Sequence, residues 1–350
     1  MSGRRCKKLL MKKAIILFNL GGPDSLDAVE PFLFNLFNDP AIISLPFFLR
    51  YPLAKLISKR RTPIAKAIYS EMGGKSPILD ETMKQARAIE DSMKLEDDVY
   101  KCFIVMRCWN PRAKETIKKV KEFNPEQIVL LPLYPQYSNA TSGSSIQEWL
   151  EICKKEKLAT ETKIICCYPT DKDFILSYAN LIREKIDLNK LSELTLIFSA
   201  HGLPELKIKQ GDPYQWQVEK TVNDLVKKLS IKNLNYILSY QSRVGPLKWI
   251  GPSTEEVIKD EAKKKKIIIV VPVAFVSEHS ETLVELDIEY KKLAVENGSR
   301  EYIRVPAVTA NKDFINSLKN SILRASNGER FTSSIRCLEK FKKCPRFYNI

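Results

Sequence analysis

The stretch IIIVVPVAFVSEHSETLVELDIEY, residues 267–290, contains both parts of the pattern that decides the fold. It begins with an apolar run rich in β-branched side chains, which is typical of a strand buried on both faces of a parallel sheet. Polar residues follow directly, at the position where open α/β sheets carry their ligand-binding loops. The stretch therefore predicts a buried strand with a chemically active loop at its carboxyl end.

Apolar runs of strand length recur along the chain, separated by charged segments with helical patterning. We expect strands at residues 14–20, 103–106, 128–133, 163–167, 194–199, 236–240, 267–273 and 302–305. Apolar strands that alternate with amphipathic helices are typical of parallel sheets covered by helices on both faces. The chain is therefore predicted to be α/β, with two halves that each contain a four-stranded parallel sheet.

The join between these halves is predicted in a helical segment that begins near Thr170. We expect an N-terminal half at residues 13–170 and a C-terminal half at residues 171–310. A closing helix at residues 311–324 is predicted to pack back on the first half. The last residues, 326–350, are predicted to form a weakly ordered tail.

Basic side chains outnumber acidic ones by 57 to 42 in the 350 residues, which gives a formal net charge of +15. Such a charge is compatible with a nucleic-acid partner, an anionic membrane surface or simply a lysine-rich surface. The lysine run at residues 263–266 contains no interleaved aromatic side chains. Because nothing resembles a recognition helix or a base-stacking platform, no nucleic-acid partner is expected.

The cysteines and the start of the chain bear on the cellular compartment. None of the eight cysteines forms a CxxC pair, and the basic residues 1–13 lack the apolar core of a secretory signal. Free cysteines are typical of a reducing compartment. The protein is therefore expected in the cytoplasm.

Residues 41–61, AIISLPFFLRYPLAKLISKRR, combine aromatic and aliphatic side chains with a basic end. Pro46, Arg50 and Pro52 interrupt this segment. No uninterrupted apolar stretch within it reaches the length of a membrane span. It is typical either of a segment that rests on a membrane interface or lines an apolar pocket mouth, or of a buried core helix. The first alternative would make the protein peripheral to the inner face of the membrane.

The chemically rich motifs follow the predicted strands directly: NLGGPDS, MRCWNP, PLYPQYSNATSGSS, SAHGLPE, SYQSRVGPLKW and SEHSETLVEL. Loops at the carboxyl ends of parallel strands converge, so these motifs predict one site. The turn Gly21-Gly22-Pro23 lacks the GxGxxG spacing, and no GxxxxGK[ST] loop is present, which disfavours nucleotide binding. The hydroxyl-rich residues 134–145 either cap a helix or hold an acidic group of a ligand.

His201 and His279 are the only histidines in the chain, and each lies in one of these motifs. Histidine has an unperturbed pKa near neutrality and is the commonest metal ligand. Two histidines at strand ends therefore favour proton transfer or metal handling over a purely structural role.

An acidic row follows His279. If this segment is helical, Glu281, Glu285 and Glu289 stack on one face at i, i+4 and i+8, an arrangement that destabilises a helix through like-charge repulsion. A solvated face would normally intersperse lysine, yet the first cations after Glu281 are Lys291 and Lys292. The row therefore favours a role in attracting a cation or accepting protons.

Together these motifs resemble the ferrochelatase family, in its bacterial, protoporphyrin-using type. The resemblance extends from residue 15 to about residue 323 and rests on NLGGPDS, KSPI, MRCWNP, LPLYPQYS, SAHGLPE, YQSRVGPLKWIGPSTEE and SEHSETLVELDIEY, in the family's order. It implies two Rossmann-like, chelatase-type halves around a porphyrin cleft. It also implies a lyase that inserts Fe²⁺ into protoporphyrin IX to form protohaem, the final step of haem biosynthesis.

The resemblance assigns roles to individual residues. It implies that His201 and Glu281 are catalytic and contact the metal, and that Glu285 and Glu289 form a path for protons or metal. The residues that it implies in substrate binding are Leu20, Arg107, Tyr134, Ser138, Trp249 and His279. Leu20 occupies a position where enzymes acting on coproporphyrin usually carry tyrosine, so it favours protoporphyrin.

Two departures from the family pattern matter. Cys108 stands where many relatives have an aromatic residue. Some relatives hold a [2Fe–2S] cluster on four cysteines, three of them near the C-terminus, whereas this tail offers only Cys337 and Cys344. No cluster and no other cofactor are expected, since Fe²⁺ is a substrate.

The residue types suit the chemistry, since histidine can accept a pyrrole proton and Fe²⁺ accepts imidazole and carboxylate ligands. Two alternatives stay open. A non-catalytic haem or metal carrier would bind porphyrin without inserting metal. A chelatase for another divalent metal or tetrapyrrole would use the same groups, although Trp249 and the apolar segment at residues 41–61 favour protoporphyrin.

Overall fold

The computed structural model describes residues 10–345 apart from Val244, Pro246 and Glu329. Most of the basic start of the chain and the last five residues of the predicted tail therefore lie outside the described residues.

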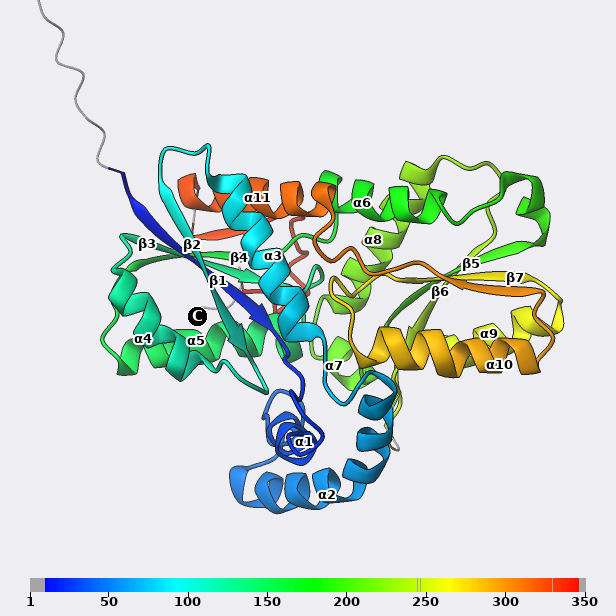
Figure 1. Ribbon diagram of the computed structural model, residues 1–350, viewed down its shortest axis with the longest axis horizontal. Helices are drawn as coiled ribbons and strands as arrows, with labels where there is room; N and C mark the ends of the chain where they lie inside the picture. The colour runs from blue at the N-terminus through cyan, green and yellow to red at the C-terminus, as the bar shows by residue number, and fades with distance from the viewer. Residues whose placement is uncertain (1–9, 244, 246, 329, 346–350) are drawn as a thin grey trace, which may run out of the picture.

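Two parallel sheets form the centre of the molecule (Figure 1). The first sheet has the strand order β2-β1-β3-β4-β9, and the second has the order β6-β5-β7-β8. The α/β prediction with two parallel sheets is confirmed. The strands are β1 (Lys12–Asn19), β2 (Val99–Met106), β3 (Gln127–Pro132), β4 (Glu161–Cys167), β5 (Leu194–His201), β6 (Tyr236–Gln241), β7 (Ile267–Pro272), β8 (Glu301–Arg304) and β9 (Phe331–Ser333).

Helices cover both faces of each sheet, as Figure 1 shows. The helices α4 and α5 lie on one face of the first sheet, with α3 and α11 on the other, while the second sheet lies between the pair α6 and α8 and the pair α9 and α10. The helices are α1 (Val29–Phe37), α2 (Phe47–Glu71), α3 (Ile78–Met93), α4 (Ala113–Phe123), η1 (Asn139–Gly143), α5 (Ser144–Lys155), α6 (Lys172–Arg183), η2 (Leu188–Glu193), α7 (Glu205–Lys209), α8 (Tyr214–Leu229), α9 (Thr254–Lys263), η3 (Glu281–Glu289), α10 (Tyr290–Glu296) and α11 (Lys312–Asn327).

The apolar strand sequences explain this layering, because successive side chains of a strand point to opposite faces. In β1, Ile16 and Phe18 face α4 and α5, whereas Ile15 and Leu17 join the core on the opposite face. That second core also includes Phe198 of β5, so one hydrophobic layer runs through both sheets. The shared layer holds the carboxyl ends of strands from the two sheets in one body.

The first sheet has five strands instead of the predicted four, and the additional strand lies in the predicted tail. Residues Phe331–Ser333 form β9, which pairs with β4 in parallel. Further along, Cys337 and Cys344 are buried in a small cluster with Phe341. The strand escaped prediction because its three residues give no hydrophobic periodicity, and backbone bonds such as Ile164 N to Arg330 O hold it in place.

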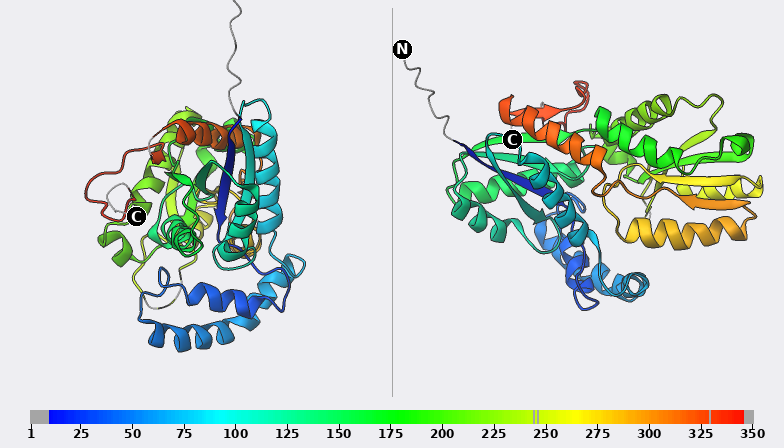
Figure 2. Two further views of the ribbon diagram at one scale, coloured as in Figure 1. Left: turned by 90° about the vertical axis from the view of Figure 1, so that its left-hand side faces the viewer. Right: turned by 45° about the horizontal axis from the view of Figure 1, so that its top comes forward.

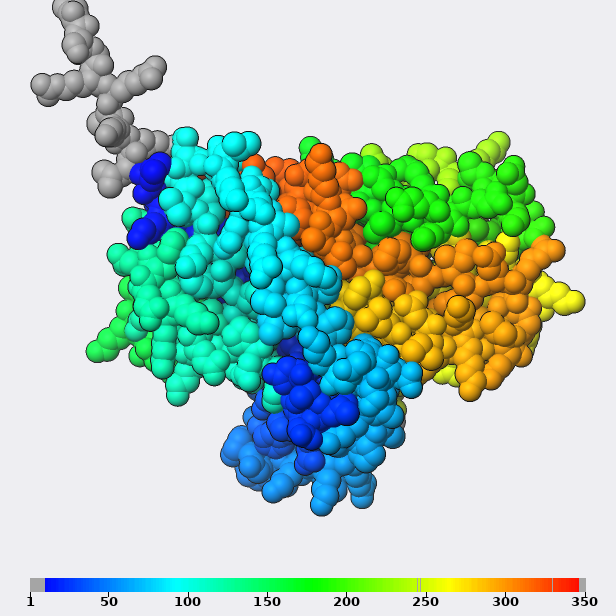
Figure 3. Space-filling model, in the orientation of Figure 1, coloured from blue at the N-terminus to red at the C-terminus, as the bar shows by residue number. Residues whose placement is uncertain are grey.

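Helices α1 and α2 project from the rest of the molecule (Figures 2 and 3). The aromatic side chains at the start of α2 are largely exposed, with 62% of Phe47 and 72% of Phe48 accessible to solvent. Tyr51 is also exposed, and Lys55 and Lys59 follow it on the same helix. The alternative of a buried core helix for residues 41–61 is therefore excluded.

Candidate active site

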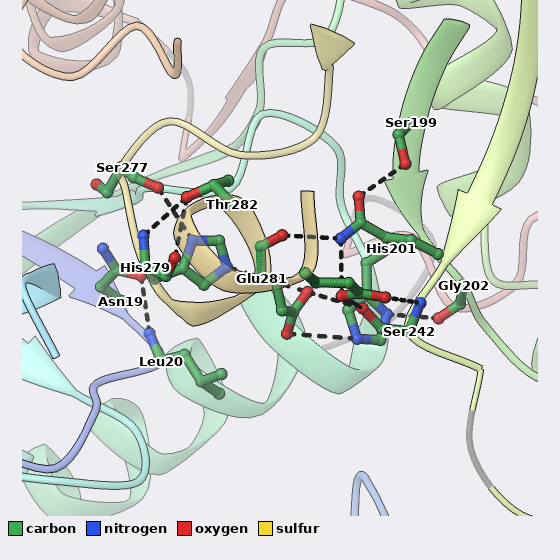
Figure 4. Close-up of polar contacts among 12 residues, drawn as sticks. Asn19, Leu20, Ser199, His201, Gly202, Ser242, Ser277, His279, Glu281 and Thr282 are labelled. Atoms are coloured by element: carbon green, nitrogen blue, oxygen red, sulfur yellow. Dashed lines mark hydrogen bonds and ion pairs between the residues drawn. The ribbon is translucent and has the colours of Figure 1, made fainter. Parts of the chain in front are cut away.

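The polar site lies where strands from both sheets end. His201 is the last residue of β5, Gln241 is the last residue of the neighbouring β6, and His279 follows β7 by a short loop. Glu281 begins the helix η3, and Leu20 follows β1 of the first sheet. Figure 4 shows Glu281 between the two imidazole rings, with Leu20 on the side of His279. The predicted convergence of strand-end motifs thus holds for these residues.

Both histidines point their Nε2 atom at the carboxylate of Glu281. Nδ1 of His201 lies 2.6 Å from the carbonyl oxygen of Gly202, and Nδ1 of His279 lies 3.2 Å from that of Ser277. Because a carbonyl oxygen only accepts, each Nδ1 carries the proton and each neutral ring keeps a lone pair on Nε2. These Nε2 atoms lie 3.7 and 4.0 Å from the carboxylate oxygens of Glu281. The site therefore presents two bases and one carboxylate to a common space.

The helix η3 is a π-helix, a form that is rare and is found mainly as short bulges at functional sites. Its Glu285 accepts hydrogen bonds from Gln241 Nε2 at 3.0 Å, from the Ser242 hydroxyl at 2.6 Å and from the Tyr290 hydroxyl at 3.0 Å. Burial, followed by the charge of Glu281, raises the pKa of Glu285. A raised pKa favours proton uptake, so Glu285 is suited to receive protons from Glu281.

Glu289 ends the same helix and is exposed to solvent. The three carboxylates thus run from the histidines to the surface along a single helix. Sequence periodicity could not distinguish this helix from an α-helix, because both forms bring residues i and i+4 to nearly the same face.

Burial lowers the pKa of His279 below its ordinary value of 6.5, although Glu281 and Glu278 oppose this shift. A lowered pKa means that the unfolded chain takes up this proton before the folded one does, so the folded state loses stability as the pH falls below 6.5. We expect the melting temperature to fall between pH 7.5 and pH 5.5 by less in His279→Asn than in the wild type. Equal losses measured by calorimetry in the two proteins would contradict this account of His279.

Trp249 lies beside the His201 loop. Its backbone forms an isolated bridge with Pro204, and its ring lies against Gly202. A Cβ atom on Gly202 would lie 3.2 Å from this ring and 2.9 Å from the Gln241 carbonyl oxygen. Glycine is therefore required here for the close approach of the tryptophan to the strand end.

Three other residues predicted to bind substrate lie in the first half and are engaged in buried contacts. Arg107 forms ion pairs with Asp39 at 3.0 Å and with Glu148 at 2.9 Å. The Ser138 hydroxyl donates to the buried Asp212 at 2.9 Å, and burial raises the pKa of Tyr134 well above its ordinary value. Their part in substrate binding stays a prediction.

Tyr69 was missed from the sequence. It lies near the end of α2, and burial raises its pKa to about 12 although its hydroxyl is hydrogen-bonded to Ser280. Ser280 directly precedes Glu281, so the end of α2 lies beside the residue that precedes the acidic helix. Only a contact between distant parts of the sequence reveals this tyrosine, since nothing in its local motif singles it out.

The two tail cysteines lie beside thiols of the first sheet. The Gln217 amide donates to the sulfur atoms of Cys167 at 3.5 Å and of Cys337 at 3.3 Å, and Cys166 lies next to Cys167. Among the residues that the structure describes, no group of three or more histidine, cysteine, aspartate or glutamate side chains is arranged to hold a metal ion.

Comparisons with known proteins agree with this geometry. The family model described as "Ferrochelatase" matches residues 12–326. A ferrochelatase of Pelagibacter ubique is 60% identical over 342 residues, covering 96% of this chain and 98% of the relative. A ferrochelatase of Rickettsia bellii is 49% identical over 344 residues, covering 95% of this chain and 94% of the relative.

Among solved structures, SirB from Bacillus subtilis with Fe³⁺ has a TM-score of 0.55 at 12% identity, covering 91% of this chain and 97% of that one. A likeness at this identity concerns the fold alone. The family match extends over nearly the whole chain and includes both histidine motifs, and the sequence relatives cover the chain almost end to end. On this evidence, the chain belongs to the ferrochelatase family.

Proposed function

We propose that this protein is a lyase that inserts Fe²⁺ into protoporphyrin IX and releases two protons, forming protohaem. The observation that carries the proposal is the convergence of His201, His279 and Glu281 at the strand ends of a ferrochelatase-family chain. The test is haem formation by the purified protein under anaerobic conditions.

The chemistry requires a base close to the ring nitrogens, because two pyrrole N–H protons must leave as the metal enters. His201 has 39% of its side chain exposed and directs Nε2 rather than Nδ1 into the site, so it is the group that we assign to accept a pyrrole proton. Glu281, 3.7 Å from this nitrogen, stabilises the imidazolium that results. Glu285 and then Glu289 would carry protons or metal between the site and the surface.

Apolar side chains near these bases suit the flat, hydrophobic porphyrin ring. Leu20, which follows β1, and Trp249, whose ring lies against Gly202, would contact the macrocycle. A site that binds the ring in a bent form directs a pyrrole lone pair at the metal and uses binding energy to lower the barrier. Arg107 and Ser138 would act from the first half through their buried contacts, and Tyr134 would act beside Arg107.

The function that competes with this proposal is a porphyrin or haem carrier. A carrier needs no base beside the ring, whereas this site places two imidazole nitrogens beside one carboxylate. We further propose that the protein works without an iron–sulfur cluster, because the tail offers two cysteines, Cys337 and Cys344, where cluster-bearing relatives have three.

We also propose that the α1–α2 projection rests on the cytoplasmic face of a membrane. Exposed Phe47 and Phe48 would enter the interface, and the following Lys55 and Lys59 would face anionic headgroups. Of the helices in the described part of the chain, none has the length and apolar character needed to cross a bilayer. A surface contact of this kind would give a hydrophobic substrate a short route from the membrane to the site.

Replacement of both Phe47 and Phe48 by serine is expected to weaken binding to vesicles of phosphatidylglycerol and phosphatidylcholine by about tenfold or more. Each phenylalanine contributes about 1.5–3 kcal/mol when fully buried in an apolar medium, and an interface recovers part of that amount. The measurement is cosedimentation over a range of lipid concentrations.

The matched control replaces Leu95 and Leu188 by serine, since these side chains are 94% and 66% exposed and lie outside the projection. The control variant is expected to bind vesicles as the wild type does. Unchanged binding of the phenylalanine variant would refute the membrane contact.

A further inference from the structure

Five carboxylates lie within residues 278–289, the segment that contains His279 and the π-helix η3. They are Glu278, Glu281, Glu285, Asp287 and Glu289. Like charges this close repel one another, and a π-helix of this length is itself an uncommon conformation. The segment therefore needs interactions from outside to keep its shape.

Arg304, the last residue of β8, supplies such an interaction. Its Nη1 atom lies 2.9 and 3.1 Å from the two carboxylate oxygens of Glu278, and its Nε atom lies 2.6 Å from Asp287. Only 10% of this arginine side chain is exposed. One planar guanidinium thus joins the residue that precedes His279 to the later part of the π-helix, a geometry that arginine permits and lysine does not.

Neighbouring contacts hold the same segment. The carboxylate of Glu278 also accepts a hydrogen bond from the backbone N–H of Ala307 at 2.9 Å. The Tyr302 hydroxyl, on the same strand as Arg304, donates to the carbonyl of Leu286 at 2.7 Å. The end of β8 therefore fixes both the entry and the body of the acidic helix.

The pairing with Arg304 divides the carboxylates into two groups. Glu278 and Asp287 have their charge balanced by the guanidinium. In contrast, Glu281 faces the two imidazoles, and Glu285 is held by neutral donors. The carboxylates that the proposed reaction uses thus keep their negative charge available for a cation or a proton.

We propose that Arg304 is a positioning residue for metal insertion: it holds the acidic helix so that His279 and Glu281 face His201, and it neutralises the two carboxylates that the reaction does not use. This inference rests on the proposed function. Arg304 touches neither of the catalytic groups and acts through Glu278 and Asp287.

The test compares Arg304→Gln, Arg304→Lys and the control Arg300→Gln, each as the full chain. Arg300 pairs with Glu193 at the surface, with 60% of its side chain exposed. We expect kcat for Fe²⁺ insertion into protoporphyrin IX to fall about tenfold or more in Arg304→Gln, equal to about 1.4 kcal/mol, with KM for porphyrin within about twofold of wild type. Arg304→Lys should recover part of kcat, and Arg300→Gln should match the wild type.

A purely structural role would lower the melting temperature and leave kcat of the folded enzyme unchanged, and that result would overturn the inference. If Arg304→Gln does not fold, Asp287→Asn decides, because this half-exposed residue loses one end of the bridge and leaves the pair between Arg304 and Glu278. Its kcat is expected to fall about threefold, and an unchanged kcat would overturn the inference. Inactivity of the wild type would instead refute the proposed function.

Discussion

Replacement of His201 by alanine is expected to slow haem formation by about a thousandfold, within the range of roughly 10²–10⁴ that a positioned general base contributes. His201 is the more exposed of the two imidazoles, with 39% of its side chain accessible against 14% for His279. Its Nε2 faces Glu281 and the site, because Nδ1 donates to the carbonyl oxygen of Gly202. Porphyrin binding, measured by fluorescence quenching, should stay within about threefold of wild type, since the apolar contacts are retained.

Added imidazole provides the control for this variant. Because the His201 side chain is partly exposed, a free imidazole can enter the space that alanine leaves. We expect imidazole to restore part of the rate in His201→Ala and to have no effect on the wild type. A variant that retains wild-type turnover would show that another group accepts the pyrrole proton.

Replacement of Glu281 by glutamine should lower the rate of metal insertion about a hundredfold or more, while the fold is retained. Glutamine keeps the size of the side chain and removes the charge that lies beside both Nε2 atoms. Glu281 is also one of the charges that raise the pKa of His279 against its burial, so its loss makes His279 a poorer proton acceptor. The measurement is the initial rate at saturating Fe²⁺ and porphyrin.

Glu296→Gln is the matched control, because Glu296 lies at the exposed end of α10 and pairs only weakly with Lys292 at 3.9 Å. It is expected to show wild-type rates. The double variant His201→Ala, Glu281→Gln should be little slower than His201→Ala alone, since residues that act as a unit are not additive. Fully additive losses would mean that the two residues act in separate steps.

Much of this architecture could be predicted from the sequence, because buried parallel strands are nearly continuous apolar runs. The eight longer strands were placed close to their observed positions, and the strand-end rule brought His201 and His279 together. The pairing of Glu281 with His201 was implied by the family resemblance. Its position between the Nε2 atoms of both histidines required the structure.

The features that escaped prediction depend on contacts between distant parts of the chain. The strand β9 is too short to show a pattern, and Tyr69 lies beside Ser280 only because the end of α2 comes close to the start of η3. Gln217 brings Cys167 and the tail residue Cys337 together, although they belong to different segments. No local sequence signal encodes such pairings, since they follow from the packing of whole elements.

The measurement that tests the central claim most directly is anaerobic incubation of the purified protein with Fe²⁺ and protoporphyrin IX, with His201→Ala and Glu281→Gln beside the wild type. Loss of porphyrin fluorescence and growth of the haem spectrum report the reaction. We predict multiple turnovers in the wild type and a collapse of the rate in both variants. Tight porphyrin binding by the wild type without haem formation, or undiminished rates in both variants, would contradict the account.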